Sequence, residues 1–235
     1  MVKTDFHTHC LPGMDDGASC PEESLSMLEL LKNQGIERVA LTSHFFIGKE
    51  TPEHFAERRK KALEKLEPFF LERNLPMLYP GAEVNIIKGV SEKDLSGLCI
   101  GDTNLILLEM PYGQFENWSV REIENIMFGQ KLCPVIAHLD RYLAWFSISD
   151  FEEILSLGNI IIQINVSAFS SYRSRKFVLN LARAGYPLVI GSDAHNLSSR
   201  SPDFSVFNKF FAKKNVRESL EKAFSRSNKI LPFEC

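Results

Sequence analysis

The chain has 235 residues, a length typical of one α/β barrel, and its 44% of hydrophobic residues can bury a sizeable core. The formal net charge is −3 and the isoelectric point is near 6.1, which argues against nucleic-acid binding because such surfaces are usually basic. Polar residues interrupt the N-terminal segment and every apolar run is short, so neither a signal peptide nor membrane insertion is expected.

Short apolar runs rich in β-formers alternate with longer amphipathic segments. The predicted strands cover residues 2–9, 38–44, 77–84, 104–110, 134–139, 159–166 and 187–195. Several of these runs are apolar at consecutive positions, which is typical of parallel strands that are buried on both faces.

The segments between the strands carry helix signals. Residues 21–35 begin with Pro21 and end at Gly35, a good pair of start and stop residues. Further helices are predicted at 51–74, 117–130, 147–158 and 171–185, and twice more after Asp203. Repeated β–α units predict one parallel sheet, and seven strands favour a barrel or a nearly closed barrel in a single domain, 1–235.

Five of the six histidines end predicted strands: His7, His9, His44, His138 and His195. Three acids take matching places: Glu83, Glu109 and Asp193. The carboxyl ends of parallel barrel strands meet at one mouth, and residues two apart on a strand point the same way. Imidazoles and carboxylates together suit manganese, iron or zinc, so this placement predicts a polynuclear metal site.

A single histidine at a strand end is more often a structural residue than a ligand, and an isolated H-x-H is a weak signal. That interpretation would have to hold independently for five histidines and three acids, so the metal site is the preferred hypothesis. His54 falls within a predicted helix and receives no role. The basic run 58–61 in that helix is interpreted as a solvated face.

The cysteines at positions 10, 20, 99, 133 and 235 are odd in number and include no C-x-x-C pair, which favours reduced thiols in the cytoplasm. Cys10 lies in the opening segment DFHTHCLPGMDDGA, where it could be a phosphatase nucleophile. Cysteine-dependent tyrosine phosphatases carry a C-x5-R loop, but Asp16 stands at the arginine position and no other cysteine has the arginine. Cys10 is therefore interpreted as a bystander near the metals.

Two arginines follow the ligand candidates. Arg141 comes three residues after His138, and Arg200 comes five residues after His195. Arginine offers planar, bidentate donors to phosphate oxygens. Either arginine alone could form a surface ion pair, but beside a metal cluster the two predict a phosphoester site.

The pieces DFHTHCLPGMDDGA, TSH, GAEV, LLEMP, AHLDRY, QINVSA and GSDAHN, between residues 5 and 196, resemble the bacterial PHP (polymerase and histidinol phosphatase) superfamily. Within it, the chain is similar to the manganese-dependent protein-tyrosine phosphatases of capsule and exopolysaccharide gene clusters. The H-x-H-x2-P-G-x-D-D-G opening is the specific part, because histidinol phosphatases usually continue differently. The family commonly has proline and glutamate where this chain has Leu139 and Asp140.

The resemblance implies a distorted (β/α)7 barrel, the PHP fold, that holds three divalent metal ions at the carboxyl ends of its strands. Manganese is the favoured metal, with iron or zinc as alternatives. The implied ligands are His7, His9, Asp16, His44, Glu83, Glu109, His138, Asp193 and His195. Glu83 would bridge two metals, Asp16 takes precedence over Asp15 by alignment with the motif, and Arg141 and Arg200 match the phosphate-binding arginines.

The implied activity is hydrolysis of phosphotyrosine by a metal-bridging hydroxide in a cytoplasmic enzyme. The implied partner is a phosphotyrosine protein, namely a bacterial tyrosine autokinase, and Phe45 and Phe46 could stack on its phenyl ring or simply pack. Two alternatives stay open: a PHP phosphoesterase for a metabolite such as histidinol phosphate, and a non-catalytic metal-binding regulatory subunit. A polymerase-associated nuclease fits poorly, because the chain is acidic and has no polymerase segment.

Overall fold

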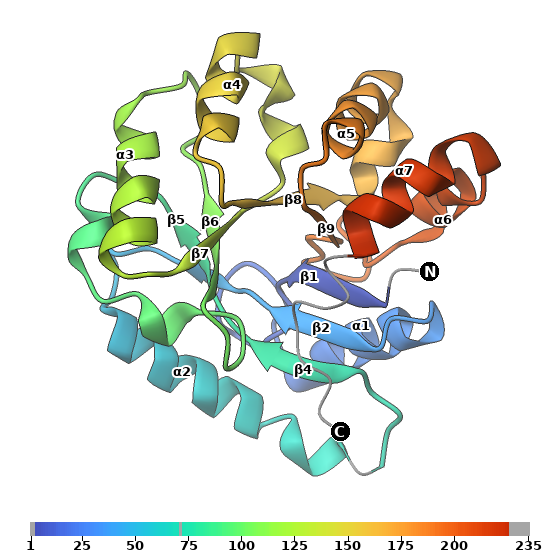
Figure 1. Ribbon diagram of the computed structural model, residues 1–235. Helices are drawn as coiled ribbons and strands as arrows, with labels where there is room; N and C mark the ends of the chain where they lie inside the picture. Colours follow the sequence, from blue (N-terminus) through green and yellow to red (C-terminus); the bar gives the residue numbers. More distant parts are fainter. Residues whose placement is uncertain (1–2, 71, 226–235) are drawn as a thin grey trace.

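Parallel strands form the centre of the protein and helices surround them in the computed structural model, which describes residues 3–70 and 72–225 (Figure 1). Three positions that belong to the predictions above lie outside the described residues: Val2, Leu71 and Cys235.

The strands pair in two sheets and not in the one sheet that was predicted, but every pair is parallel, as predicted. The first sheet has the order β1-β2-β4, with β1 at Thr4–Thr8, β2 at Arg38–Leu41 and β4 at Met77–Pro80. The second has the order β3-β5-β6-β7-β8-β9, with β3 at His44–Phe45, β5 at Glu83–Asn85, β6 at Leu105–Glu109, β7 at Cys133–Ile136, β8 at Ile161–Asn165 and β9 at Leu188–Gly191.

Two predicted strands are divided where they pass from one sheet to the other. The 38–44 strand becomes β2 and β3, and the 77–84 strand becomes β4 and β5. The hydrogen bonds between the two divided segments continue across the break, because the Gly81 N–H donates to the Leu41 carbonyl at 2.9 Å and the Glu83 N–H donates to the Ser43 carbonyl at 3.0 Å. Counted as continuous strands, these segments still give the seven that were predicted.

The outer strands of the two sheets meet, so the barrel is nearly closed. The Asp193 N–H donates to the His7 carbonyl at 2.8 Å, and the His9 N–H donates to the Ala194 carbonyl at 2.9 Å. These bonds bring the end of β9 beside β1. The distorted seven-stranded barrel predicted from the sequence is therefore confirmed.

Helices cover the outside of the barrel (Figure 1). They are α1 (Pro21–Asn33), α2 (Pro52–Glu64), α3 (Trp118–Glu124), α4 (Ile148–Ser156), α5 (Tyr172–Ala184), α6 (Ser205–Phe211) and α7 (Lys214–Ser225). The start of α1 at Pro21 and the two helices after Asp203 agree with the predictions. No helix in the described ranges combines the length and the apolar character that a membrane span requires.

Two predicted helices are wrong in their extent. The helix predicted at 51–74 ends at Glu64, and Glu67–Phe69 form a separate 3-10 turn. Pro68 explains the break, because proline disfavours helical geometry in the residue before it and lacks an N–H. The helix predicted at 117–130 ends at Glu124 and continues as a π-helical turn, Asn125–Gly129.

The basic run on α2 is only partly a solvated face. Lys60 and Lys61 are exposed, whereas Arg58 and Arg59 are half-buried. Arg58 Nη2 lies 2.6 Å from Glu50 Oε1, and Arg59 donates to a backbone carbonyl at 2.9 Å. Half of the run therefore makes tertiary contacts.

The inner face of the strands changes character toward their carboxyl ends. A buried apolar cluster, which we call the barrel floor, consists mainly of strand residues and comprises Phe6, Ala40, Ile100, Leu105, Leu107, Val135, Ala137, Ile161 and Val189. Glu109 follows Leu107 by two positions on β6, and Gln163 follows Ile161 by two on β8. Because such residues share a face, buried polar side chains lie directly above the floor, at the mouth of the barrel.

Candidate metal centre

All nine residues that the resemblance implies as metal ligands lie together at the mouth. Their side chains form four overlapping groups, in each of which the potential ligand atoms lie within 4.8 Å of one another. The groups are His7–Glu83–His138, His7–His9–Asp193, His44–Glu83–Glu109 and His9–Asp16–His44–His195. We call these nine residues the metal cluster.

Glu83 lies at the centre of the metal cluster and is fully buried at the start of β5. Its Oε2 is 3.1 Å from His7 Nε2, 3.3 Å from His9 Nε2 and 3.1 Å from His44 Nδ1. Its Oε1 is 2.9 Å from His138 Nε2. One carboxylate that faces four imidazoles is suited to contact two cations at once.

The two aspartates of the opening motif have different surroundings. Asp16 Oδ1 lies 3.5 Å from His195 Nε2 and 3.7 Å from His44 Nε2, and its side chain is 64% exposed at the mouth. Asp15 is nearly buried and accepts hydrogen bonds from His9 Nδ1 and from the His44 backbone N–H, both at 2.7 Å. Asp15 therefore orients an imidazole from behind, as outer-shell carboxylates do, and Asp16 faces the cluster.

The donor set fits divalent cations. Four buried atoms of the cluster have no hydrogen-bond partner among the described residues: Glu83 Oε2, His44 Nδ1, His138 Nδ1 and His195 Nε2. Glu83 Oε2 and His44 Nδ1 lie 3.1 Å apart, and His195 Nε2 lies 3.5 Å from Asp16 Oδ1. Buried polar groups are normally hydrogen-bonded or bound to a metal, and imidazole and carboxylate ligands suit manganese, iron and zinc.

The electrostatics of the cluster favour positive charge at its centre. Burial opposes protonation of His9, but the neighbouring carboxylates of Asp15 and Glu83 outweigh burial and raise the pKa of His9 to about 10. Burial is likewise outweighed at His138, where Glu109 and Glu83 raise the pKa to about 9. The carboxylates thus favour positive charge between them. Protonated imidazoles supply that charge, and so do metal ions when they displace the protons from the imidazoles.

Two cluster residues have a backbone conformation that residues other than glycine rarely adopt. The φ angle is +29° at His138 and +54° at Asp193. Such conformations cost on the order of 1–3 kcal/mol and occur mainly at functional sites. Hydrogen bonds hold both residues: the His138 N–H donates to Gln163 Oε1 at 2.6 Å, and the Asp193 N–H donates to the His7 carbonyl at 2.8 Å.

Strand β8 supplies two functional residues that sequence reasoning missed, Gln163 and Asn165. Gln163 Oε1 lies 3.0 Å from His7 Nδ1 and also accepts from the His138 backbone, so one amide fixes two cluster residues. Gln163 Nε2 donates to Asn165 Oδ1 at 2.9 Å, and Asn165 Nδ2 donates to Asp193 Oδ2 at 3.1 Å. Their signal was present in the sequence, because they are two polar residues at positions i and i+2 of an apolar strand.

Two glycines make room for the first histidines, and neither was singled out from the sequence. A Cβ atom at Gly191 would lie 2.5 Å from the His7 Cβ, and one at Gly17 would lie 2.1 Å from the His9 carbonyl oxygen. Such close approaches are a tertiary property, and the sequence carries no separate signal for them.

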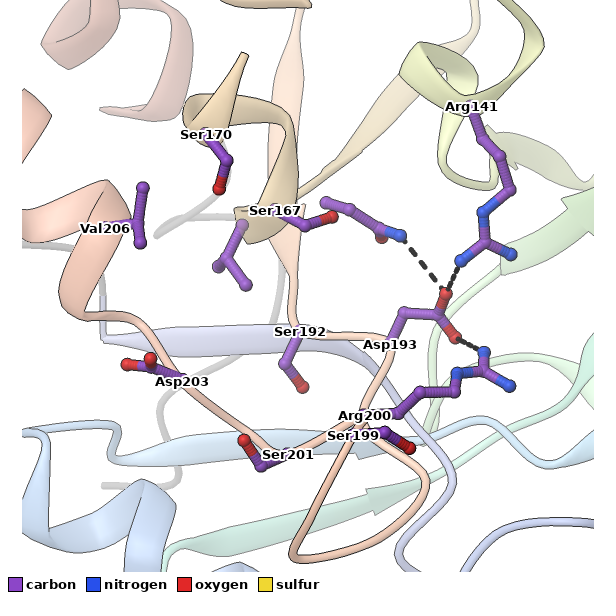
Figure 2. A pocket seen from close by; sticks show the side chains of 12 residues that line it. Arg141, Ser167, Ser170, Ser192, Asp193, Ser199, Arg200, Ser201, Asp203 and Val206 are labelled. Carbon is purple, nitrogen blue, oxygen red and sulfur yellow. Dashed lines mark hydrogen bonds and ion pairs between the residues drawn. The ribbon is translucent and has the colours of Figure 1, made fainter. Parts of the chain in front are cut away.

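Arg141 and Arg200 lie beside the metal cluster, and Figure 2 shows both guanidinium groups turned toward Asp193. Arg200 Nη2 is 3.0 Å from Asp193 Oδ1, and Arg141 Nη2 pairs with Asp193 Oδ2. Arg141 also donates to the Tyr112 hydroxyl at 2.9 Å, and Arg200 Nη1 lies 3.6 Å from Asp16 Oδ2. Asp193 thus holds two guanidinium groups at one rim, and such groups are suited to donate hydrogen bonds to phosphate oxygens.

A pocket of about 400 Å³ opens over the cluster, and both arginines line it. Two aromatic side chains, Phe46 and Tyr112, also line this pocket. The Phe46 ring is 5.4 Å from the His44 ring, and the Tyr112 ring is stacked 6.3 Å from the His138 ring.

The other phenylalanine that could have stacked on a substrate ring is a core residue. Phe45 is fully buried and packs edge-on against Phe55 at 5.5 Å. Of the two alternatives stated for Phe45, packing is therefore the one that the structure confirms, because its side chain points away from the mouth into the apolar layer between the strands and the helices.

Cys10 is fully buried, and the described cysteines are free thiols. Burial raises the pKa of the Cys10 thiol far above its usual range. A reactive cysteine needs a lowered pKa and access to substrate, so the geometry agrees with a bystander role.

The chain is similar to known phosphatases over most of its length. Tyrosine-protein phosphatase YwqE of Bacillus subtilis is 29% identical over 210 residues, which cover 84% of this chain and 79% of that protein. Tyrosine-protein phosphatase CpsB of Streptococcus pneumoniae is 28% identical over 240 residues, which cover 94% of each.

Solved structures share the fold. A chain from the crystal structures of YwqE and CpsB, described as metal-dependent tyrosine phosphatases, matches with a TM-score of 0.75 at 23% identity and covers 98% of this chain and 96% of that one. Histidinol phosphate phosphatase of Lactococcus lactis, solved with zinc, L-histidinol and phosphate, matches with a TM-score of 0.55 at 16% identity, over 94% and 93% of the two chains.

The match to a protein family extends over nearly the whole sequence. The family model described as capsular polysaccharide synthesis, CpsB/CapC, matches residues 3–231. This match confirms the resemblance that the opening motif and the strand-end motifs indicated. The chain therefore belongs to the CpsB/CapC family of capsular polysaccharide synthesis proteins.

Proposed function

We propose that the protein is a metal-dependent protein-tyrosine phosphatase of capsule or exopolysaccharide synthesis, built as a single domain. The observation that carries the proposal is the convergence of nine imidazole and carboxylate side chains and two arginines on one pocket. The names of the relatives, tyrosine-protein phosphatases that align with 84% and 94% of this chain, support the same conclusion.

The metal cluster would hold three divalent ions, with manganese favoured over iron and zinc and with Glu83 shared between two ions. The four ligand groups overlap at His7, His9, His44 and Glu83, which supports several ions held close together with shared ligands. Bound ions would supply the Lewis acidity that ionises a water molecule for attack on phosphorus and that neutralises phosphoryl oxygens.

Arg141 and Arg200 would bind the phosphoryl group. Their side chains are 31% and 38% exposed at the mouth, so they can reach a substrate while Asp193 keeps them oriented. Planar guanidinium groups donate two parallel hydrogen bonds to phosphate oxygens and stabilise the charge that spreads over them during transfer.

Phe46 and Tyr112 would receive the phenyl ring of phosphotyrosine. They line the pocket over the cluster and lie against two different cluster histidines. An aromatic pair contributes about 0.5–1.5 kcal/mol beyond the area that it buries, so these walls favour an aryl phosphate over an alkyl phosphate.

The identity of the partner kinase and the location of the protein in the cell stay predictions. A bacterial tyrosine autokinase is the proposed phosphotyrosine substrate, and the family description supports a role in capsular polysaccharide synthesis. A cytoplasmic location is part of the same proposal, because the protein would meet the autokinase there.

Three substrates and a metal-replacement series test the proposal. Protein stripped with EDTA would be assayed on p-nitrophenyl phosphate, a phosphotyrosyl peptide and histidinol phosphate, before and after addition of Mn²⁺, Fe²⁺ or Zn²⁺, with elemental analysis of each sample. We expect no turnover after stripping, recovery with Mn²⁺, and hydrolysis of the two aryl phosphates only.

Each other result identifies an alternative. Turnover that survives exhaustive chelation would exclude a metal-dependent mechanism. A preference for histidinol phosphate would indicate the small-metabolite phosphoesterase. A protein that binds three ions but hydrolyses none of the substrates would be the regulatory subunit.

A further inference from the structure

A second pocket adjoins the mouth and shares Arg141 and Arg200 with it (Figure 2). It measures about 340 Å³, and its walls come from the turn between β8 and α5 and from the segment that leads into α6. Serine is the most frequent residue in its lining, which includes Ser167, Ser170 and Ser201, so we call it the serine pocket. Nothing in the proposed hydrolysis uses these residues.

A third pocket, of about 440 Å³, is lined by residues of α5 and α6 and by Lys213, which follows α6. Val206 of α6 lines the serine pocket, and Phe210, one helical turn later, lines the third pocket. On the opposite wall, Ser170 lines the serine pocket and Tyr172 the third. The two pockets are therefore successive, separated by about 6 Å along α6.

The third pocket is strongly basic, and we call it the basic pocket. Its lining includes four cations and no acid: Arg175, Lys176, Arg183 and Lys213. None of the four forms an ion pair with a carboxylate anywhere in residues 3–70 and 72–225. This is an uncompensated positive surface on a chain whose net charge is −3.

Contacts within the basic pocket hold part of this charge in place. Arg175 Nη1 donates to the Phe169 carbonyl at 2.9 Å, and its guanidinium lies 5.6 Å from the centre of the Phe210 ring. Lys213 Nζ lies 5.4 Å from the centre of the same ring. Two cations are thus fixed on one aromatic ring at the wall of the pocket, which leaves their charge unneutralised.

We infer that the serine and basic pockets together bind an acidic segment of the polypeptide that carries the phosphotyrosine. The inference rests on the proposed function, because the mouth must hold the phosphotyrosine while the flanking chain follows α5 and α6. An extended chain advances about 3.3 Å per residue, so about two residues span the step between the two pockets. Acidic residues roughly three to six positions from the phosphotyrosine would reach the basic pocket.

The arrangement favours a polypeptide over a lipid surface or a nucleic acid. The positive charge lies at the end of a line of pockets that begins at the phosphate-binding arginines. Serine hydroxyls between the two ends can both donate to and accept from the C=O and N–H groups of a peptide backbone. Opposite charges at the rim of an interface act mainly through partner selection and association rate.

A charge-reversal pair tests the inference. The double variant Lys176→Glu/Arg183→Glu changes two exposed residues of the basic pocket. The matched control Lys60→Glu/Lys65→Glu makes the same change in net charge on exposed residues at and just after the end of α2, which lies across the barrel from α5 (Figure 1). Both would be assayed on p-nitrophenyl phosphate and on phosphotyrosyl peptides with acidic or with amide flanks on either side.

We expect kcat/KM for the acid-flanked peptide to fall about three- to tenfold in the basic-pocket variant, and the other substrates to be unaffected. The control variant should match the wild type. The advantage of acidic flanks should also shrink at high ionic strength, where exposed charges are screened.

A binding measurement separates this inference from the proposed function. Peptides that carry non-hydrolysable phosphonomethyl-phenylalanine would be titrated into each protein by fluorescence anisotropy. The inference would be overturned if the wild-type protein bound acid-flanked and amide-flanked peptides with equal affinity. It would also be overturned if the basic-pocket variant and the control variant lost affinity for the acid-flanked peptide to the same extent. Both results hold whether or not the protein hydrolyses a substrate. The inference would also be overturned if the basic-pocket variant lost binding to phosphatidylserine vesicles or to single-stranded DNA while its peptide binding stayed the same as in the wild type. Failure to hydrolyse p-nitrophenyl phosphate would count against the proposed function alone.

Discussion

The barrel floor and the mouth both contain buried side chains of the same strands, but these side chains differ in chemistry. Leu107 of the floor is fully buried, and Glu109, two residues farther along β6, is only 2% exposed. A buried leucine stabilises the fold by about 1.5–3 kcal/mol, whereas a buried carboxylate destabilises it unless it is paired or bound to a metal. The floor therefore stabilises the fold, and this stabilisation offsets the cost of burying charged groups at the mouth.

Backbone strain follows the same division. Of the non-glycine residues with a positive φ within the described ranges, His138 and Asp193 belong to the metal cluster and Lys131 lies in a loop before β7. No floor residue is among them. If this division is physical, changes at the mouth should alter turnover and metal binding, and changes at the floor should alter stability.

Asp193→Asn should reduce turnover most. The amide keeps the shape of the side chain and tolerates the positive φ, but it removes the charge that pairs with Arg141 and Arg200 and faces His7 and His9. We expect kcat/KM for p-nitrophenyl phosphate to fall by about 10²–10³-fold. Turnover close to wild type would contradict the proposed site.

Gln163→Leu should weaken metal binding. The substitution preserves volume but removes the acceptor of the His138 N–H and the partner of His7 Nδ1. Loss of such outer contacts typically weakens metal affinity by about 10–100-fold. Manganese titration by calorimetry measures the effect. Ile162→Val, on the opposite face of the same strand, is the control, and equal affinities in the two variants would refute the assigned role.

Leu107→Ala should show the opposite behaviour. A cavity at the floor should lower the free energy of unfolding by about 2–5 kcal/mol, measured by urea denaturation. The kcat of the remaining folded protein should change little, because Leu107 contacts no substrate. If this variant lost turnover to the same extent as Asp193→Asn while still folded, the floor and the mouth would not be separable.

Cys10→Ser should have the smallest effect. Cys10 lies beside His9 but is fully buried and takes no part in the proposed chemistry. Turnover should match the wild type, and iodoacetamide should not inactivate the native enzyme. Loss of activity in the variant, with the metal content unchanged, would reopen the question of a cysteine nucleophile.

Much of the fold and of the candidate site followed from local patterns. Consecutive apolar positions predicted parallel strands, and the histidines and acids at the strand ends predicted which side chains would meet. Pairs such as His7 and His9 need only the two-residue repeat of a strand to share a face. The early end of α2 could also have been predicted, since Pro68 stands within the expected helix.

The sequence by itself determined the order of the elements, the barrel class and the types of side chain at the mouth, because periodicity and residue chemistry are local properties. Only the tertiary structure decided that β9 lies beside β1, that Gln163 holds two cluster residues, that Gly191 makes room for His7, and that the serine and basic pockets continue from the mouth. These features depend on the twist and register of strands far apart in the chain, which no local pattern encodes.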